Sequence, residues 1–338
     1  MHTMKAFEQT VGAPSPQALT AAVAEARRGE AGGRETILAA LCWSAFASPA
    51  SIVAIYDLIS CAWLGEETVF LPEGESLLAD ATSAPLSADF WQAFWSVIEQ
   101  QNLDAAGITA AVAQLGGALD PSMEHLSEQA ARSHKGATAV LERAVPGRTD
   151  IAALAECPAG SLGRVLHTMI VDNGYDLEVL DREAIALSGL PPALKYLNVR
   201  ILQMHDVWHL TAGYTTSGSH EIAISAFQLA QFGHNYSAMF LAVVLMKSHR
   251  SLPRSFPILL QLISEAWVHG RTTPALMDIE WESEWTSSIE DIRHKYGIAP
   301  YTSVLPAQLL ETFAQGSWFQ RIKVGLQLMR LSRQWQAA

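Results

Sequence analysis

The stretch from residue 204 to residue 233, MHDVWHLTAGYTTSGSHEIAISAFQLAQFG, sets three histidines, an aspartate and a glutamate between two apolar helical patterns. Residues four apart stack on one face of a helix, so His205 and His209 are predicted to project side by side. They continue an apolar row that begins with Leu197 and Ile201. The row predicts a core-facing stripe that ends in two imidazoles.

Glu221 lies on a second predicted helix, after the break GYTTSGS at 213–219, whose glycines and serines suit a turn and an N-cap. The face that carries Glu221 continues through Ile224, Ser225 and Gln228. A helical hairpin would bring this carboxylate opposite the two imidazoles, as in carboxylate metal sites built between facing helices. Two histidines and one glutamate are a typical ligand set of an open, catalytic zinc site.

Asp206 lies roughly 100° around the helix from His205. It is a candidate for a metal ligand, for a group that orients His205, or for a proton donor. We therefore expect metal ligands among His205, Asp206, His209 and Glu221, and catalytic roles for His205, Asp206 and Glu221. The alternative is a set of ordinary, satisfied polar groups in a core, which two histidines at this spacing with two nearby carboxylates disfavour.

The overall composition narrows the class of protein. The formal charge is −12, from 22 Lys and Arg against 34 Asp and Glu, which disfavours nucleic acid as a partner. The three cysteines form no Cys-x-x-Cys pattern, so a disulfide framework is not expected and a reducing compartment fits. The longest apolar run, 238–246, is too short to span a bilayer, and the first residues lack an apolar leader core. We expect a cytoplasmic protein of bacterial type, with peripheral contact to the inner membrane face as an option.

Most of the chain consists of Ala- and Leu-rich runs with apolar residues three or four apart, and no window shows the alternation of a strand. We predict an all-α protein, a multi-helix bundle with a buried metal site between two helices and a helical amino-terminal extension. Three parts are expected: 1–140, helical and of unknown role; 141–305, the metal-binding domain; and 306–338, an amphipathic helix region. Aromatic residues at helical spacing in the first part are predicted to be core, namely Trp43, Trp63, Trp91, Phe94 and Trp95.

The segment 316–338 contains no acidic residue. Four cations accompany an apolar face, which predicts a membrane-surface or partner-binding helix, or alternatively a docked helix with solvated basic edges. The cations are Arg321, Lys323, Arg330 and Arg333, and the apolar face is Trp318, Phe319, Ile322, Leu326 and Met329. The apolar runs 237–246 and 256–267 are candidates for the walls of a tunnel for a lipid tail, with Met239 and Met246 as adaptable liners, or else for ordinary core.

The order His205-Asp206-x-x-His209, eleven residues, then Glu221 resembles the signature of the Coq4 family of ubiquinone-biosynthesis proteins. Three further stretches are similar to the family: CPAGSLGRVLHTMIVDNGYDLEVL at 157–180, GSHEIAISAFQLAQFG at 218–233 and LMDIEWESEWTSSIEDIRHKYGI at 276–298. The resemblance covers about residues 140 to 300. In the first part only FASPASIVAIYDLI is weakly similar.

The resemblance implies a mostly helical protein that binds a divalent metal through this signature, zinc being expected first and iron or manganese as alternatives. It also implies peripheral membrane association and a place in an assembly that makes ubiquinone, with a homodimer as a further expectation. The implied activity is oxidative decarboxylation of a polyprenylated hydroxybenzoate, in which a hydroxyl replaces the carboxylate at ring carbon 1. The partner is then a prenylated aromatic acid or a quinone-like small molecule.

Three other functions compete with this interpretation. The protein could be a non-catalytic scaffold that binds prenyl quinones or lipids, or a relative recruited to another aromatic metabolite. A phosphohydrolase of the His-Asp type is disfavoured, because His167, Asp172 and His234 lack the contexts that such a site requires.

Overall fold

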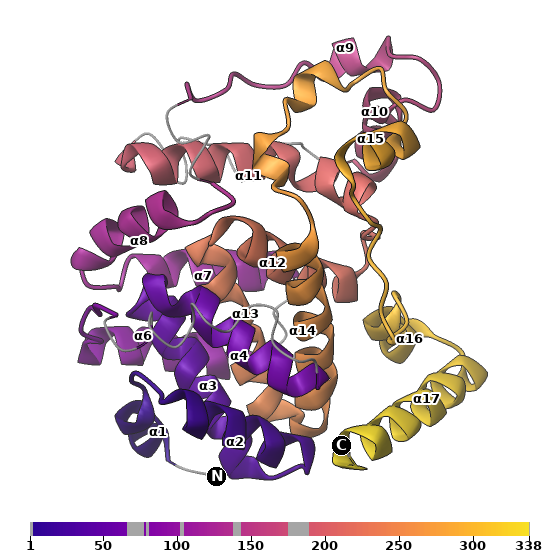
Figure 1. Ribbon diagram of the computed structural model, residues 1–338. Helices are drawn as coiled ribbons and strands as arrows, with labels where there is room; N and C mark the ends of the chain where they lie inside the picture. The colour runs from indigo at the N-terminus through magenta and orange to yellow at the C-terminus, as the bar shows by residue number, and fades with distance from the viewer. Residues whose placement is uncertain are drawn as a thin grey trace.

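The computed structural model describes residues 3–65, 78, 81–101, 105–137, 143–174 and 189–337, and in these ranges the protein consists of helices and connecting loops (Figure 1). One isolated antiparallel bridge, between Ser161 and Ser288, is the only β pairing found within the described ranges. The predicted all-α class is confirmed.

The first part of the chain forms short helices that begin at predictable residues. Side-chain oxygens of Thr3, Ser15 and Ser87 accept a hydrogen bond from the backbone N–H three residues ahead, which caps a helix start. The helices are α1 (Met4–Thr10), α2 (Pro16–Arg27), α3 (Ala31–Phe46), the 3-10 turn η1 (Pro49–Ser51), α4 (Ile52–Leu64), α6 (Ala88–Glu99), α7 (Ala105–Gly116) and α8 (Ser122–Ser133).

Aromatic side chains fill the core of this part. Phe46 packs against Phe90 and Phe94, and Phe7 meets the edges of Trp91 and Trp95. The predicted core aromatics are confirmed as buried: Trp43, Trp63, Trp91, Phe94 and Trp95.

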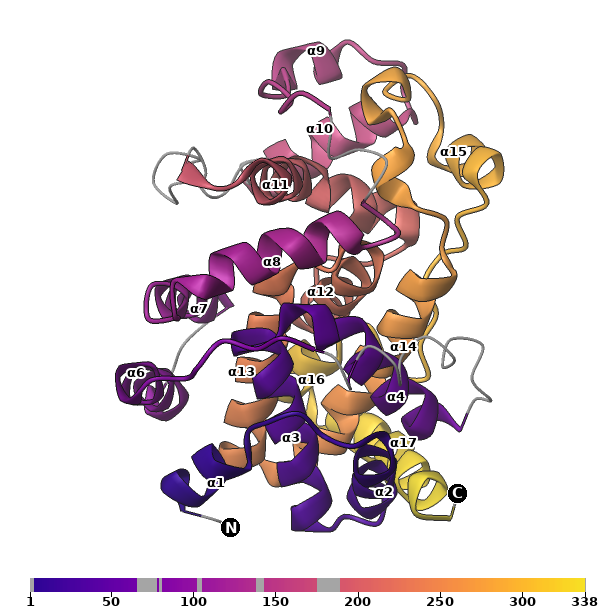
Figure 2. The same ribbon diagram turned by 60° about the vertical axis from the view of Figure 1, so that its left-hand side comes forward.

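The second part begins with two helices at one end of the molecule and continues into the long helices that hold the site. Figures 1 and 2 show α11 lying across the bundle beside α8, with α9, α10 and α15 beyond it. The helices are α9 (Ile151–Ala155), α10 (Leu162–Asn173), α11 (Pro192–Ala212), α12 (Gly218–Phe232), α13 (Asn235–Ser251), α14 (Phe256–Thr272), α15 (Ile289–Tyr296), α16 (Leu309–Gln315) and α17 (Trp318–Ala337), with 3-10 turns η4 (Pro253–Ser255), η5 (Leu276–Asp278) and η6 (Trp281–Ser283).

Helices α12 and α14 pack closely because Gly270 lacks a side chain. A Cβ atom at Gly270 would lie 2.7 Å from the Cβ of Ala230 and 2.7 Å from the carbonyl oxygen of Phe227. The runs proposed as tunnel walls lie in α13 and α14, and Met239 and Met246 are buried in the common hydrophobic core. In the structure Met239 and Met246 are therefore ordinary core residues, which was the alternative to a tunnel lining.

The amino-terminal helices pack directly on the second part. Asp57 of α4 is 2 % exposed and accepts hydrogen bonds from Trp267 Nε1 at 2.7 Å and from Arg271 Nε and Nη2 at 3.1 and 3.2 Å. Tyr56 stacks on Trp267 with ring centroids 4.8 Å apart. A buried carboxylate is stable only when it is paired in this way, so α4 and α14 are held in one fixed arrangement.

The carboxyl-terminal end of the last helix, α17, packs against the body of the protein. The amide oxygen of Gln261 accepts hydrogen bonds from Trp63 Nε1 at 2.8 Å and from Trp335 Nε1 at 3.0 Å. One residue of α14 thus joins α4 and α17. None of the described helices combines the length and the apolar character needed to cross a membrane.

Candidate metal centre

His205 and His209 occupy the last two turns of α11, one turn apart on the same face. Their Nε2 atoms lie 3.1 Å apart, and the rings meet edge to face. Two nitrogens that bind one zinc ion at about 2.0–2.1 Å in tetrahedral geometry lie roughly 3.3 Å from each other. The imidazole spacing therefore suits a shared cation.

Glu221 lies in the first turn of α12 and faces both rings. Its Oε2 atom is 3.3 Å from His205 Nε2 and its Oε1 atom is 3.3 Å from His209 Nε2. The turn between the helices fixes this approach, because Ser217 caps α12 and Gly213 ends α11 in the left-handed region at φ 82°. The sequence prediction that a hairpin brings the three side chains together is confirmed as geometry.

Asp206 lies beside this group. One ligand atom each from His205, Asp206 and His209 can be chosen so that all lie within 4.8 Å of one another, and this is the one such group found in the described part of the chain. Burial raises the pKa of Asp206, against the lowering effect of the two neighbouring histidines. A carboxyl group with a raised pKa holds its proton more readily than an ordinary aspartate.

Two groups that the sequence analysis did not assign orient the imidazoles. The side-chain amide nitrogen of Gln228 lies 2.7 Å from His205 Nδ1, and the backbone carbonyl oxygen of Tyr214 lies 3.3 Å from His209 Nδ1. The Tyr214 carbonyl can only accept, so His209 carries its proton on Nδ1 and the lone pair of Nε2 is free for a metal ion. Turning the Gln228 amide, so that its oxygen faces Nδ1, gives His205 the same tautomer. Gln228 lies on the predicted face of Glu221, seven residues on, and this spacing was the available signal.

The electrostatics of the centre favour an ionised carboxylate. Burial opposes the charged form of Glu221, but hydrogen bonds and charge from His205 and His209 outweigh it and hold the pKa well below the usual range. Burial likewise opposes a charged His205, yet Glu221 and Asp206 raise its pKa. The site stabilises positive charge next to Glu221, which is the environment that a divalent cation would occupy.

The three side chains that meet at the centre differ in their exposure to solvent. The His209 side chain is 1 % exposed, whereas those of His205 and Glu221 are 33 % and 37 % exposed. Small molecules can therefore reach the group from the side of His205 and Glu221, whereas the His209 side chain is buried in the protein.

Family-like residues beyond the signature hold the helix that carries the histidines. Arg293 of α15 donates to the carbonyl oxygens of Thr211 and Leu210 at 2.8 and 2.9 Å, which satisfies the end of α11. Arg200 of α11, buried, pairs with Glu282. Glu282 and Arg293 both lie in the family-like stretch 276–298, which thus supports the helix that carries the histidines.

Comparison with known proteins agrees with these observations. Residues 86–302 match the sequence profile of the family described as Coenzyme Q (ubiquinone) biosynthesis protein Coq4. The match includes α6, α7 and α8 and so begins well before the segment from about residue 140 in which motifs are visible. The all-helical fold and the His-Asp-His-Glu hairpin fit a ubiquinone-biosynthesis protein.

The chain belongs to the Coq4 family. The mouse mitochondrial ubiquinone biosynthesis protein COQ4 homolog is 25% identical over 188 residues, which cover 53% of this chain and 66% of the relative. The COQ4 protein of Coprinopsis cinerea is 24% identical over 183 residues, covering 53% of this chain and 60% of the relative. The chain therefore spans less than two thirds of the length of these curated relatives.

A crystal structure of a protein from Nostoc punctiforme PCC 73102, described as a ubiquinone biosynthesis protein, is also similar. It is 25% identical, with a TM-score of 0.49 over 62% of this chain and 97% of the other. The sequence analysis also found a family-like stretch at 157–180, and its last residues, 175–180, lie outside the described residues.

Proposed function

We propose that this protein binds a divalent metal ion through His205, His209 and Glu221 and decarboxylates a prenylated hydroxybenzoate in ubiquinone biosynthesis. The observation that carries the proposal is the convergence of two Nε2 atoms 3.1 Å apart with the Glu221 carboxylate, whose Oε2 lies 3.3 Å from His205 Nε2 and whose Oε1 lies 3.3 Å from His209 Nε2. Zinc fits this donor set, and iron or manganese would fit it as well. When bound, the ion would supply positive charge that anchors and polarises an acidic substrate group.

The other requirements of the reaction are oriented imidazole rings, an ionised carboxylate and a proton donor, and different residues of the site meet them. The Tyr214 carbonyl accepts from His209 Nδ1–H and the Gln228 amide bonds to His205 Nδ1, and these two contacts fix the orientation of the rings. Glu221, with its lowered pKa, stays ionised. Asp206, whose pKa burial raises, is the group proposed to deliver a proton to ring carbon 1 of an electron-rich phenol.

The proposed decarboxylation balances as a proton exchange. The proton of Asp206 forms the new bond at ring carbon 1, carbon dioxide leaves, and the electrons of the broken carbon–carbon bond restore the aromatic ring. Solvent then protonates Asp206 again through the open side of the site. Conversion to the phenol additionally needs dioxygen as the oxidant and water as the source of the hydroxyl, with peroxide as the reduced product.

Metal content of purified protein tests the site before any substrate is needed. Near-stoichiometric metal in the wild type that is lost in His205→Ala/Glu221→Ala is the expected result. The matched control is His167→Ala/Glu290→Ala, which removes the same residue types outside the site and should retain metal. Metal-free wild-type protein would contradict the metal centre, and bound metal without turnover of a prenylated hydroxybenzoate would favour the scaffold function instead.

A further inference from the structure

Helix α17 has two apolar faces on opposite sides. The inner face, which includes Val324 and Trp335, packs on the body of the protein. At about 100° per residue, a second apolar face points the opposite way. Its members are exposed: Trp318 67%, Phe319 76%, Ile322 40%, Leu326 49% and Met329 54%. We call these five residues the outer face.

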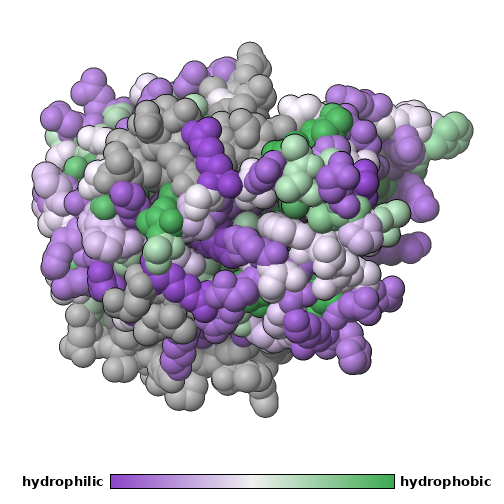
Figure 3. All heavy atoms as spheres, turned by 90° about the horizontal axis from the view of Figure 1, so that it is seen from above, coloured by the Kyte–Doolittle hydropathy of each residue, from purple (hydrophilic) through white to green (hydrophobic). Residues whose placement is uncertain are grey.

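The outer face has no covering partner within the described residues, which is unusual for a contiguous group that includes two large aromatics. Figure 3 views the molecule from the end that carries α9, α10 and α15, and there hydrophobic side chains of the described residues are interspersed with hydrophilic ones. The match to the Coq4 family ends at residue 302, so α17 belongs to a part of this chain that the family does not define.

Cations flank the outer face on both sides. Arg321 lies along one edge, Lys323 and Arg330 lie along the other, and Arg333 follows Met329 at the end of the face. None of these four forms an ion pair with a described residue, and 316–338 contains no Asp or Glu. In a chain of net charge −12, this concentration of positive charge is local to the helix.

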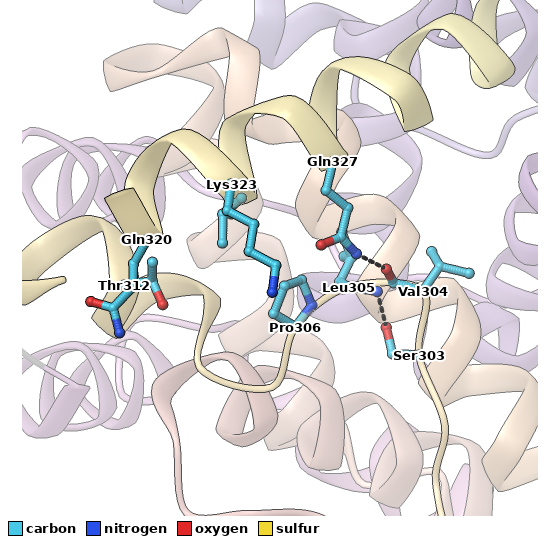
Figure 4. Close-up of a pocket in the computed structure, with 9 residues that line it drawn as sticks. Ser303, Val304, Leu305, Pro306, Thr312, Gln320, Lys323 and Gln327 are labelled. Atoms are coloured by element: carbon cyan, nitrogen blue, oxygen red, sulfur yellow. Dashed lines mark hydrogen bonds between the residues drawn. The ribbon is translucent and has the colours of Figure 1, made fainter. Parts of the chain in front are cut away.

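A pocket of about 440 Å³ lies under one edge of the helix, between the 303–306 loop, α16 and α17. Figure 4 shows Lys323 reaching from α17 toward Pro306, with Gln320 and Thr312 on one side and Gln327 on the other. Gln327 donates to the Val304 carbonyl, and no carboxylate lines the pocket. Lys323 is the one charged lining residue, so the pocket suits an anionic group.

We propose that the outer face of α17 docks on an anionic lipid bilayer. Trp318 and Phe319 enter the interfacial region, the flanking cations meet the headgroups, and Lys323 contacts a lipid phosphate. Apolar area and basic flanks together are what an interfacial helix needs. A second copy of the chain fits less well, because a symmetric contact through this face would oppose its cations to one another.

The segment that leads into α17, namely α16 and the loop before it, contacts the helix that carries Glu221. Ser217, the N-cap of α12, donates to the Ala307 carbonyl, and the Gly218 N–H donates to Glu311 of α16 at 2.6 Å. Docking through α17 would therefore anchor, through α16, the helix start three residues from Glu221. That consequence rests on the proposed function, whereas lipid docking itself does not.

Vesicle flotation of the full chain tests the proposal. We expect binding to phosphatidylcholine vesicles with about 30 mol % phosphatidylglycerol, weakened about tenfold on pure phosphatidylcholine and by salt raised to about 0.5 M. Trp318→Ser/Phe319→Ser should lower the lipid partition coefficient about tenfold or more. Lys323→Glu/Arg330→Glu should abolish the preference for anionic vesicles. The matched control, Val171→Ser/Arg148→Glu, alters one exposed apolar residue and one exposed cation at the far end of the molecule and should bind as the wild type does.

Circular dichroism of each variant shows whether its helices are retained, and both α17 variants change exposed side chains. Failure of the wild type to float, or equal flotation of wild type and Trp318→Ser/Phe319→Ser, would overturn the proposal. Loss of a concentration-dependent dimer in the same variant without any lipid binding would assign the face to a second copy. Metal content is read separately, so failure of docking is distinguishable from failure of the metal site.

Discussion

At the scale of single residues, the orientation of His205 depends on one amide. Gln228→Leu removes the partner of Nδ1 but leaves the three proposed ligands in place. Loss of such a partner typically lowers metal affinity about 10–100-fold, and we expect this loss in a chelator competition. Gln231→Leu is the control, since Gln231 lies on the same helix but bonds to Gly270 and Thr273. Equal affinities in wild type and Gln228→Leu would remove the role assigned to the amide.

Asp206 gives a second prediction at this scale. Asp206→Asn keeps a similar volume but cannot act as an acid, so metal content should stay while turnover falls about 10²–10⁴-fold. Because the acid must be protonated and burial raises its pKa, the wild-type rate should fall as pH rises through that pKa. Full turnover by Asp206→Asn, or a variant that loses its metal, would assign a different role to Asp206.

The residues of the centre were predictable to different degrees. The four-residue spacing of His205 and His209 places them on one face of a helix because helical periodicity determines this, and the glycine and serine break before Glu221 predicts the hairpin that brings it opposite them. Tyr214 could not be predicted, since it contributes a backbone carbonyl, which every residue type possesses. Gln228 lay on the predicted face, but its role becomes visible only when the rotation of α12 against α11 is known.

At the scale of elements, the turn between α11 and α12 determines how the ligands meet. Gly213 has φ 82°, and a Cβ there would lie 2.9 Å from the Cβ of Pro300. Gly213→Ala should therefore lower the free energy of unfolding more than Gly160→Ala, which has φ 81° and open space around it. The strain common to both is about 1–2 kcal/mol, and the contact adds to it only at residue 213. Urea unfolding checks this, and equal losses would show that the contact with Pro300 is unimportant.

The far end of α12 makes stability depend on pH. Burial lowers the pKa of His234 to about 4 from an ordinary value of 6.5, and that of His134 likewise. Between these values the unfolded chain binds a proton that the folded chain does not, so stability falls as pH drops from about 6.5 to about 4. Each histidine contributes at most about 3 kcal/mol.

His234→Asn removes one of these two groups and should reduce the loss of stability between pH 6.5 and pH 4 by the share that His234 contributes. Urea midpoints measured at several pH values between 4 and 7 give the slope directly. An unchanged slope in the variant would mean that His234 is protonated without cost in the folded protein.

At the scale of the whole molecule, the contacts that join distant parts were beyond sequence reasoning. Helical class, aromatic core and the amphipathic character of α17 follow from local periodicity. The bonds from Trp63 and Trp335 to Gln261 join residues 198 and 74 positions apart, and no local pattern specifies them. The division at residue 140 stays a prediction, and the family match that begins at 86 shows that family identity extends beyond the visible motifs.

The pairing of Asp57 with Arg271 tests whether the amino-terminal helices stabilise the part that carries the site. Arg271→Leu leaves a buried carboxylate without its cation, which should lower the free energy of unfolding by about 3–5 kcal/mol. Asp57→Leu/Arg271→Leu removes both charges and should recover most of that loss, because well-packed apolar groups replace a buried pair at little cost. Urea unfolding followed by tryptophan fluorescence and by circular dichroism gives both numbers. If Arg271→Leu unfolds at the wild-type midpoint, the two parts are held together by apolar packing and the ion pair contributes little.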